Sequence, residues 1–381
     1  NENEIIEKID IGGVSLIRAA AKNFSYLMVI SSKDQFRSVL NYLKSNDFSS
    51  EIVYRKKLAS KAFKLIADYD RDIDEFFGTS TELYQKLRYG ENPHQKGIFK
   101  GDIKEIFDKL NGKDLSYNNL LDIDSAITLI SEFSETTFAI IKHNNACGIA
   151  SSQDVLSSYK LALQSDPISA FGGVLITNDK IDQKASLEID KLFFEIIISP
   201  EYDNKALEIL KSKKQRIILV QKTIIKNNLS YRNLLNGIIQ QEKDVIVNDV
   251  NNWNLVTNAK PSSSEISDLE FANKIVKHSK SNAIVLAKNR QMVSSGVGQT
   301  SRVDALKFAI QKAKIFKLPI NGSAMASDAF FPFPDCVEIA SKAGVSTIIQ
   351  PGGSIKDELS VKACNDKNIS MFLSGVRHFY H

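Results

Sequence analysis

The stretch 136–163 reads TTFAIIKHNNACGIASSQDVLSSYKLAL, which runs from an apolar strand through a short polar loop into a helix. The stretch 282–310 reads NAIVLAKNRQMVSSGVGQTSRVDALKFAI and repeats that layout. Each is followed by a Phe-containing segment, SAFGGVLITN at 169–178 and SDAFFPFPD at 327–335. Strands that alternate with helices are typical of an α/β fold. The shared layout predicts an internal duplication of one α/β/α layer.

Capping boxes are expected where the two helices begin. Ser151 with Asp154 should begin the first helix, and Ser301 with Asp304 the second. We expect the segments before them, KHNNACGIA and NRQMVSSGVGQT, to be loops. The second helix should turn one apolar face inward. The residues of that face are Val303, Leu306 and Ile310.

The first part of the chain predicts a separate α/β unit. We expect an Ala-rich helix over 11–23, a buried strand at Tyr26–Ser31, an amphipathic helix over Lys33–Asn46 and a longer helix from Ser49 to about Phe77. The sequence Gly-Thr-Ser-Thr at 78–81 then breaks the helical pattern, which predicts a domain boundary near residue 80. A polar connection at 251–264 should divide the remainder into two similar halves, about 81–250 and 251–381.

Composition excludes several classes of protein. The 49 Lys and Arg residues against 45 Asp and Glu residues give a net charge of +4 over 381 residues, whereas a nucleic-acid binder usually concentrates basic charge on one face. No apolar run approaches the roughly 18 residues of a membrane span. The three cysteines form no CxxC pair, which disfavours disulfides and a zinc site and suits a reducing cytoplasm.

The start of the chain, NENEIIEKIDIGG, is acidic and polar where a signal peptide would be basic and then apolar. The first residue is Asn1 rather than Met. We therefore expect a chain that is processed, trimmed or a fragment.

Lys142 and His143 stand where an apolar strand ends, the usual location of ligands in open α/β sheets. In a functional interpretation, His143 is a general base and Lys142 stabilises a developing oxyanion. The alternative is a surface Lys-His pair followed by a turn of Asn residues, and the residues alone do not decide between the two. No pair among the five His residues has a metal-ligand spacing such as HExxH, which disfavours a metalloenzyme.

Two Gly-rich segments precede predicted helices. Gly296 and Gly298 lie before a Ser-capped helix, where free backbone N–H groups and the helix dipole favour an anion, and Arg302 lies beside them. The alternative is an ordinary tight turn. PGGSIKDE at 351–358 should enter its helix through Ser354 as cap, with Asp357 completing a capping box.

An aromatic cluster in SDAFFPFPD is typical of a wall that stacks on a flat heterocycle. Its members are Phe330, Phe331 and Phe333, and Pro332 and Pro334 in the same segment prevent a regular ladder. The alternative is a turn that fills the core. Arg377 and His378 lie near the end of the chain, which a preceding strand-like segment should anchor.

Eight motifs occur in one order along the chain and together resemble a single family. They are IDIGG…RAAAKN, RYGENPHQ, KHNNACG, DPISAFGG, GVGQTSRVD, SDAFFPFPD, IIQPGGSIKDE and GVRHFYH. The family is the bifunctional purine-biosynthesis enzyme that combines AICAR (5-aminoimidazole-4-carboxamide ribonucleotide) formyltransferase with IMP cyclohydrolase. The resemblance covers the whole chain. Composition and spacing alone reach only an α/β enzyme with an anionic ligand that stacks on aromatic side chains.

The resemblance implies a formyltransferase domain at 81–381, with a duplicated cytidine-deaminase-like α/β/α fold that lacks zinc. Its cosubstrate is 10-formyltetrahydrofolate, whose formyl group passes to the 5-amino group of AICAR. The matching motif implies His143 as proton acceptor and Lys142 as transition-state stabiliser. The implied AICAR contacts are Arg88, Tyr89, His143, Gly172, Glu195, Asn282, Arg302, Phe330 and Arg377. The implied folate contacts are Val303, Asp335, Ser354 and Ile355.

One position departs from the family pattern. The family loop commonly reads KHxNPCG, and here Ala146 replaces the proline, which loosens the backbone next to Lys142 and His143. No reacting group is lost.

The resemblance also implies that residues 1–80 are part of a methylglyoxal-synthase-like domain that closes formyl-AICAR to IMP. Asp10 and Ile11 match positions that bind this substrate, and Lys22 matches a proton-transfer position. The family's Gly-rich start would precede Asn1. We therefore expect this chain to form formyl-AICAR but to make little IMP.

The family is a cytoplasmic homodimer with formyltransferase sites at the subunit interface, so we expect a dimer and neither nucleic-acid nor membrane partners. A monovalent cation near the site is left open. One alternative is a noncatalytic nucleotide-binding module that retains the fold, which would be expected to have lost Lys142, His143 or the arginines. A second is a deaminase-like hydrolase, which would need a His/Cys/Cys zinc set that three isolated cysteines do not supply.

Overall fold

The computed structural model describes residues 2–77, 84–223, 228–246 and 249–381. The chain divides into two compact units. The helical unit comprises residues 1–85 and 99–102, and the sheet unit comprises residues 86–98 and 103–381. Among the described residues, no helix combines the length and the apolar character that crossing a bilayer requires.

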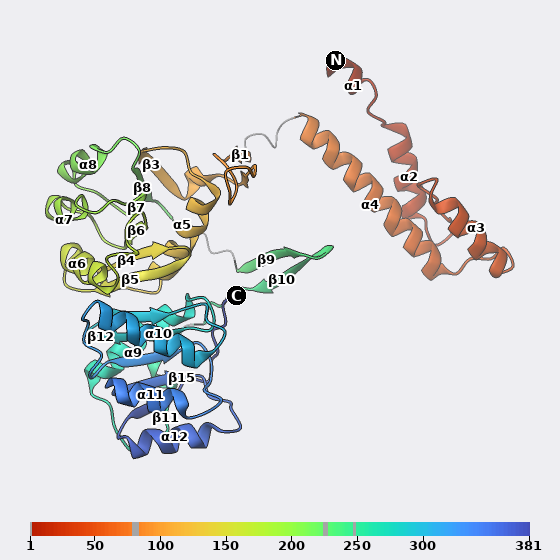
Figure 1. Ribbon diagram of the computed structural model, residues 1–381. Helices are drawn as coiled ribbons and strands as arrows, with labels where there is room; N and C mark the ends of the chain where they lie inside the picture. The colour runs from red at the N-terminus through yellow and green to blue at the C-terminus, as the bar shows by residue number, and fades with distance from the viewer. Residues whose placement is uncertain (1, 78–83, 224–227, 247–248) are drawn as a thin grey trace. The chain divides into compact units, whose positions relative to one another are not determined.

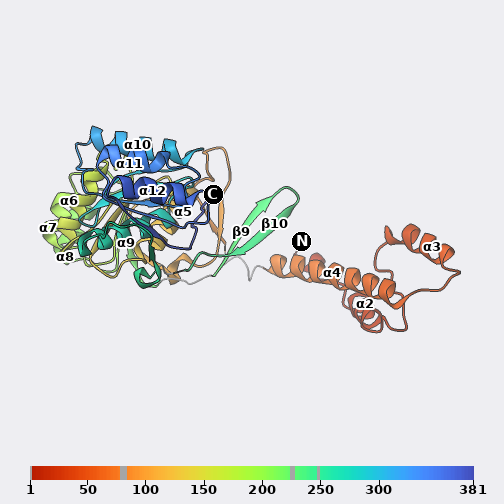
Figure 2. The same ribbon diagram turned by 90° about the horizontal axis from the view of Figure 1, so that it is seen from below.

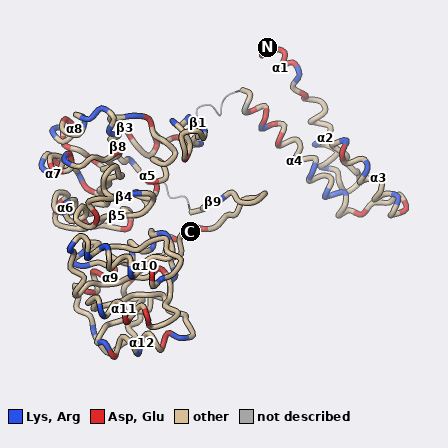
Figure 3. The backbone as a smooth tube through the Cα atoms, in the orientation of Figure 1, with Lys and Arg blue, Asp and Glu red and all other residues tan. Residues whose placement is uncertain are grey.

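The helical unit is built from α1 (Glu2–Ile6), α2 (Gly12–Lys22), α3 (Gln35–Ser45) and α4 (Ile52–Phe77) (Figure 1). The last three confirm the helices predicted for this part of the chain. α4 carries its basic residues toward its start and its acidic residues toward its end (Figure 3), the reverse of what the helix dipole favours. Packing of its apolar residues must therefore stabilise α4. The buried residues of this small core are Ala21, Val29, Val39, Leu58, Ala59 and Ala62.

The strand predicted at Tyr26–Ser31 is wrong. The backbone there has no ladder partner among the described residues, and Tyr26 is 89% exposed. Val29 alone of this segment joins the buried core, and the N–H of Ser31 donates to the side chain of Gln35. An apolar run predicts burial, but a strand also needs a neighbour for its N–H and C=O groups.

The sheet unit contains a mixed sheet of 12 strands in the order β11-β16-β15-β14-β12-β13-β5-β4-β6-β7-β8-β3. The strands of one half are β3 (Phe107–Asn111), β4 (Thr137–Lys142), β5 (Asn145–Ser151), β6 (Val174–Thr177), β7 (Ile196–Ser199) and β8 (Ile217–Gln221). Those of the other half are β11 (Asn254–Leu255), β12 (Ile284–Lys288), β13 (Gln291–Gly296), β14 (Ala324–Ser327), β15 (Thr347–Gln350) and β16 (Ser370–Leu373).

The two halves of this sheet repeat one order of strands. At the centre, β5 pairs with β13, and each belongs to an antiparallel hairpin with β4 or β12. Outward from each hairpin come an antiparallel neighbour, two parallel strands and a final antiparallel edge strand. The apolar strands predicted at the start of the stretches 136–163 and 282–310 are confirmed as β4 and β12.

Helices cover both faces of the sheet. One face packs against α5 (Tyr117–Ile130) and α9 (Ser263–Lys277), which share a single apolar core. Figure 2 shows α9 on the opposite side from α10 and α11. The other face packs against α6 (Val155–Ser165), α7 (Gln183–Ile189) and α8 (Asn204–Lys211) in one half, and against α10 (Arg302–Ile315), α11 (Asp335–Ala343) and α12 (Asp357–Asp366) in the other. The α/β class predicted from the sequence is confirmed.

The smaller elements of the chain lie outside the large sheet. They are β1 (Tyr84–Lys86), β2 (Ile98–Lys100), the antiparallel pair β9 (Leu229–Leu234) and β10 (Gly237–Glu242), and the 3₁₀ turns η2 (Ile103–Glu105) and η3 (Val250–Asn252).

The loops predicted after β4 and β12 are wrong in large part, because residues 145–150 of the first segment belong to β5 and residues 291–296 of the second belong to β13. Only two residues remain as the turn of each hairpin. The predicted cap at Ser151 is also wrong, because Ser151 ends β5 and Asp154 caps α6 by accepting from Ser157 N. Ser301 does cap α10 and accepts from Asp304 N, as predicted.

The predicted inward face of α10 is confirmed, since its three apolar residues belong to or pack against one core cluster. The predicted cap at Ser354 is wrong. α12 begins after Lys356, and the carboxylate of Asp357 instead accepts from the N–H groups of Gly353 and Ser354.

Gly148 in β5 lies directly against helix α6. A Cβ added there would stand 2.0 Å from the carbonyl oxygen of Ala162. Because the atom that the new Cβ would meet belongs to the backbone of α6, it cannot rotate out of the way. We therefore expect Gly148→Ala to lower the free energy of unfolding by about 1–3 kcal/mol. Gly237→Ala, whose Cβ meets nothing within 4 Å, is the matched control for thermal unfolding. Equal melting temperatures for the two variants would contradict this account.

A buried charge cluster joins the ends of α5 and α9. Glu132 Oε1 lies 2.8 Å from Lys277 Nζ and 2.9 Å from His278 Nε2. Burial raises the pKa of the Glu132 carboxyl, but the hydrogen bonds from His278 and Lys277 outweigh burial and lower the pKa from 4.5 to about 2. The cluster therefore fastens the two halves of the sheet unit to each other.

The lowered pKa of Glu132 predicts a pH-dependent contribution to stability. A carboxyl with a depressed folded-state pKa stabilises the fold above its ordinary pKa, and that stabilisation is lost as the pH falls through the folded value. Between pH 4.5 and about 2, we expect the urea midpoint of the wild type to fall more steeply than that of Glu132→Gln. Parallel curves for the two proteins would refute a stabilising role for this cluster.

Candidate functional site

Lys142, the last residue of β4, points its amine at the Gly172 segment. Its Nζ donates to the carbonyl oxygens of Phe171 at 2.9 Å and Gly172 at 3.1 Å. Gly172 has φ +69°, and a Cβ there would stand 3.2 Å from Lys142 Nζ. Glycine therefore suits both the backbone conformation and the close approach of the amine. Lys142 of KHNNACG and Gly172 of DPISAFGG, which were predicted as site residues from separate motifs, are thus in contact.

His143 and Asn144 form the two-residue turn between β4 and β5, which we call the His143 turn. Both have positive φ, 52° and 64°, as the two central residues of a type I′ hairpin turn do. Asn145 Nδ2 donates to the His143 carbonyl oxygen at 2.9 Å. The His143 side chain is exposed, so its ring nitrogens can reach a substrate.

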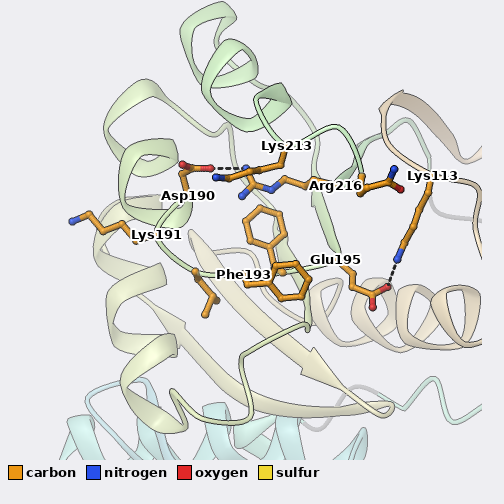
Figure 4. A pocket seen from close by; sticks show the side chains of 10 residues that line it. Lys113, Asp190, Lys191, Phe193, Glu195, Lys213 and Arg216 are labelled. Atoms are coloured by element: carbon orange, nitrogen blue, oxygen red, sulfur yellow. Dashed lines mark hydrogen bonds and ion pairs between the residues drawn. The ribbon is translucent and has the colours of Figure 1, made fainter.

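Glu195 lies directly before β7 and next to the Gly172 segment. Its N–H donates to the carbonyl of Gly173 at 3.1 Å. Its carboxylate lies 3.3 Å from Lys113 Nζ and accepts from Asn119 Nδ2 at 3.3 Å. Figure 4 shows Lys113 reaching across to this carboxylate. Glu195 therefore has one cation and one amide already in place.

Glu195 also lines a cavity of about 270 Å³. On the far side of this cavity, Arg216 pairs with Asp190 at 2.8 Å (Figure 4). The Arg216 guanidinium also lies 4.2 Å from the centre of the Phe194 ring. Lys213 also lines it. The sequence interpretation did not identify this basic cavity.

Arg88 and Tyr89 lie beside the start of α5. The backbone N–H of Arg88 donates to Leu115, and the carbonyl of Tyr89 accepts from Tyr117. The Arg88 guanidinium is exposed and lies 5.1 Å from the centre of the Tyr89 ring. The same helix carries Asn119, so RYGENPHQ approaches the Glu195 side of the site.

Arg302, Asn282 and Phe330 meet at the open end of the β12–β13 hairpin, away from its turn. Arg302 Nη2 donates to Asn282 Oδ1 at 2.8 Å and to Asp328 Oδ1 at 3.0 Å, and its Nη1 donates to the Phe330 carbonyl at 3.2 Å. Arg302 is 10% exposed at its side chain and Asp328 is fully buried. Arg302 Nε is buried and has no hydrogen-bond partner among the described residues. The guanidinium is therefore largely committed to the protein, not free to clamp a phosphate.

The end of the chain packs against this Arg302 cluster. The N–H of His378 donates to the Asp328 carbonyl at 2.9 Å, and Ser281 N donates to Tyr380 at 2.9 Å. Arg377 is exposed, with its guanidinium 4.5 Å from the centre of the Phe379 ring. Lys280 N donates to Asn145 Oδ1 at 3.1 Å, which joins this cluster to the His143 turn.

The four residues predicted to contact folate lie on neighbouring loops and helix starts of the second half. Val303 follows Arg302 on α10, and Asp335 begins α11. Lys356 lies 4.3 Å from the centre of the Phe333 ring, which brings the loop of Ser354 and Ile355 beside the aromatic segment. Ile355 is fully exposed.

The predicted site residues of the helical unit are not brought together. Asp10 accepts from Gly13 N at 2.8 Å before α2, and Ile11 is 73% exposed. Lys22 ends α2 and is exposed. At about 1.5 Å per residue, the ends of this 11-residue helix lie roughly 15 Å apart.

Several residues of the site were missed by the sequence interpretation. Asp122 of α5 accepts from Asn144 N at 2.7 Å and interacts electrostatically with His143, Lys142 and Glu195. Asp328 neutralises Arg302. The one available signal for Asp122 was a spacing shared by both halves, Ser-x-x-Asn-x-x-Asp at 116–122 and Ser-x-x-Glu-x-x-Asp at 262–268.

No group of three or more His, Cys, Asp or Glu side chains that could hold a metal was found within the described ranges. The three cysteines are all buried and unpaired. Burial raises the thiol pKa of each to about 12, so they are poor nucleophiles and poor metal ligands at neutral pH. They are Cys147, Cys336 and Cys364.

Comparison with known proteins gives a consistent result. Residues 20–312 match the model of the AICARFT/IMPCHase bienzyme family. The bifunctional purine biosynthesis protein PurH of Bacteroides thetaiotaomicron is 53% identical over 389 residues, which span 100% of this chain and 77% of that protein. PurH of Caldicellulosiruptor saccharolyticus is 45% identical (99% and 77%), and PurH of Aquifex aeolicus is 41% identical (100% and 78%). The chain therefore belongs to the AICARFT/IMPCHase bienzyme family, whose members act in purine biosynthesis.

Proposed function

We propose that the sheet unit transfers the formyl group of 10-formyltetrahydrofolate to the 5-amino group of AICAR. The observation that carries the proposal is the His143 turn, where an exposed imidazole directly follows Lys142, the residue whose amine is fixed on the carbonyls of Phe171 and Gly172. Membership of the AICARFT/IMPCHase bienzyme family supports this choice of substrates, and Lys142 and His143 at one strand end support a cation and a base.

The chemistry requires both groups. The AICAR amine is a poor nucleophile because its lone pair is delocalised into the ring. As its nitrogen bonds to the formyl carbon, His143 accepts the proton that the amine loses, and the formyl oxygen gains negative charge. The bond from carbon to the folate nitrogen then breaks, and that nitrogen takes up a proton to give tetrahydrofolate.

Lys142 is placed to stabilise the charge on the formyl oxygen. Its ammonium carries three N–H donors, and two of them are held by the carbonyls of Phe171 and Gly172. The third donor can meet the oxyanion. Because the amine is fixed before the substrate arrives, little reorganisation accompanies the reaction.

The arginines divide the work of binding AICAR. Arg88 and Arg377 are exposed and can receive the 5′-phosphate. Arg302 is held by Asn282 and Asp328, so we assign it to fixing the Phe330 loop against which the imidazole ring would stack. Glu195 and Gly172 would complete the AICAR site.

The reduced folate would bind on the second half, at Val303, Asp335, Ser354 and Ile355. The exposed ring of Phe333 provides apolar surface for the pterin there. We further propose that the sheet unit is a duplicated cytidine-deaminase-like domain without zinc, which the repeated strand order supports.

For the helical unit we propose part of a methylglyoxal-synthase-like cyclohydrolase domain, with Asp10, Ile11 and Lys22 in its site. The chain would act in the cytoplasm as a homodimer with formyltransferase sites at the subunit interface. The buried thiols suit a reducing compartment.

The proposal is tested by mixing the chain with AICAR and 10-formyltetrahydrofolate and following tetrahydrofolate by absorbance and formyl-AICAR by mass spectrometry. Equal amounts of both products are expected, with none when AICAR is omitted. Binding of AICAR without turnover would favour the noncatalytic alternative and contradict the proposal.

A further inference from the structure

The His143 turn has a counterpart in the second half, the Asn289 turn formed by Asn289 and Arg290 between β12 and β13. Both of its residues also have positive φ, 54° and 54°. A lysine precedes each turn, and Lys288 Nζ donates to the carbonyl of Asn321. Gly322 has φ +70°, and its added Cβ would stand 3.3 Å from Lys288 Nζ, as at Gly172. The two turns thus share one frame, and only the first carries a histidine.

Each turn is held by an aspartate from the helix on the same face of the sheet. Asp122 accepts from Asn144 N at 2.7 Å. Asp268 accepts from Asn289 N at 2.9 Å and from Arg290 N at 2.7 Å. Each aspartate is the sixth residue of its helix, α5 or α9.

The helix start that places each aspartate is also repeated. Ser116 and Asn119 form a capping box at the start of α5, and Ser262 and Glu265 form one at the start of α9. A capping box fixes where a helix begins and hence which residues face the sheet. The aspartate carboxylate is thus placed at the equivalent position of the helix next to each turn.

Such an anchor matters because left-handed backbone is unfavourable for residues other than glycine, at roughly 1–2 kcal/mol each. A carboxylate that accepts the turn's N–H stabilises this conformation with a charge-assisted hydrogen bond. Without it, the turn would sample other conformations and carry the His143 ring away from the AICAR amine.

The surroundings of Asp122 differ from those of a purely structural anchor. Burial raises the pKa of the Asp122 carboxyl, while the Asn144 N–H, His143 and Lys142 oppose that rise and Glu195 adds to it. The charged groups that act on its pKa are therefore the residues assigned above to proton transfer, charge stabilisation and AICAR binding.

We propose that Asp122 is the positioning residue of formyl transfer, which holds the His143 imidazole where it can accept the AICAR proton. This inference rests on the proposed function. Asp268 has the same structural task at a turn without a histidine, and it provides the matched control within the same chain.

The test compares Asp122→Ala, Asp122→Asn and Asp268→Ala with the wild type at a temperature where all four are folded. We expect Asp122→Ala to lower kcat about 10- to 100-fold while KM for AICAR changes less than about threefold, because a 1 Å misplacement of a reacting group can cost that much. Asp268→Ala should lose at least as much thermal stability and keep kcat within about twofold.

Asp122→Asn keeps an acceptor oxygen of nearly the same shape but no charge. We expect its kcat to lie between those of the wild type and Asp122→Ala, because neutral hydrogen bonds are about half as strong as charge-assisted ones. This variant decides the question if Asp122→Ala does not fold. A wild-type kcat in either Asp122 variant, or an equal loss of kcat in Asp268→Ala, would overturn the inference.

Including His143→Ala in the same series distinguishes a failure of the proposed function from a failure of the inference about Asp122. If it retains full kcat, the proposed function is wrong about the base. If it loses activity while both Asp122 variants keep theirs, the proposed function stands and the positioning role of Asp122 does not.

Discussion

Replacing His143 by Ala is expected to lower kcat for formyl transfer by about 10²–10⁴-fold, the usual contribution of a positioned general base. The AICAR amine must lose a proton as its bond to the formyl carbon forms, and among the described residues of the His143 turn the imidazole is the group able to accept it. KM for AICAR should change little, because binding rests mainly on the arginines and Glu195. The rate is read from the absorbance of tetrahydrofolate.

The matched control is Asn289→Ala, which removes the side chain at the equivalent position of the Asn289 turn. Asn289 and His143 have nearly equal φ angles, 54° and 52°. It should keep wild-type kcat. Added imidazole should restore part of the activity of His143→Ala and leave Asn289→Ala unchanged. A His143→Ala protein with near-normal kcat would show that another group takes the proton.

The second large effect is expected for Arg302→Met, which should lower the free energy of unfolding by about 3–5 kcal/mol. Met replaces much of the side-chain volume but leaves the fully buried carboxylate of Asp328 without its cation, 3.0 Å away in the wild type. It also releases the Phe330 loop and Asn282, so AICAR binding should weaken as well. Urea unfolding and AICAR titration measure the two losses.

Two further variants isolate the cause. Arg290→Met removes a cation that lies 3.8 Å from Glu135, with both side chains nearly half exposed, and should cost less than about 1 kcal/mol. Adding Asp328→Asn to Arg302→Met should recover part of the lost stability, because the unpaired buried charge is gone. Similar losses in Arg290→Met and Arg302→Met would contradict the role given to this buried pair.

The sequence predicts the outer plan of the sheet unit because its strands and helices have clear periodicity. It fails at the two central strands, β5 and β13, which were expected to be loops. Their residues include Gly148 and Ser294, small or polar types that score poorly as strand formers. They fit because helices lie directly against them, as the clash of an added Cβ at Gly148 shows.

The opposite error occurs at Tyr26–Ser31. Its apolar residues indicate a strand, yet strand formation depends on a partner that no local pattern reveals. The helices around it were predicted correctly because a helix satisfies its own backbone groups.

The candidate site could likewise be predicted only in part from the sequence. Lys142 and His143 could be found because they follow an apolar strand, where α/β folds place ligands. Asp328 could not, and only the repeated spacing pointed to Asp122, because their partners, Arg302 and Asn144, are 26 and 22 residues away in sequence. Their importance comes from burial and charge pairing, which only the folded chain brings about.

The most direct test of the central claim is a crystal structure of the chain with AICAR and an unreactive folate analogue. The account predicts that the 5-amino nitrogen of AICAR lies about 2.6–3.2 Å from a His143 ring nitrogen, with Lys142 facing the position of the formyl oxygen. AICAR bound instead in the cavity lined by Lys113, Lys213 and Arg216, with its amine out of reach of His143, would contradict it.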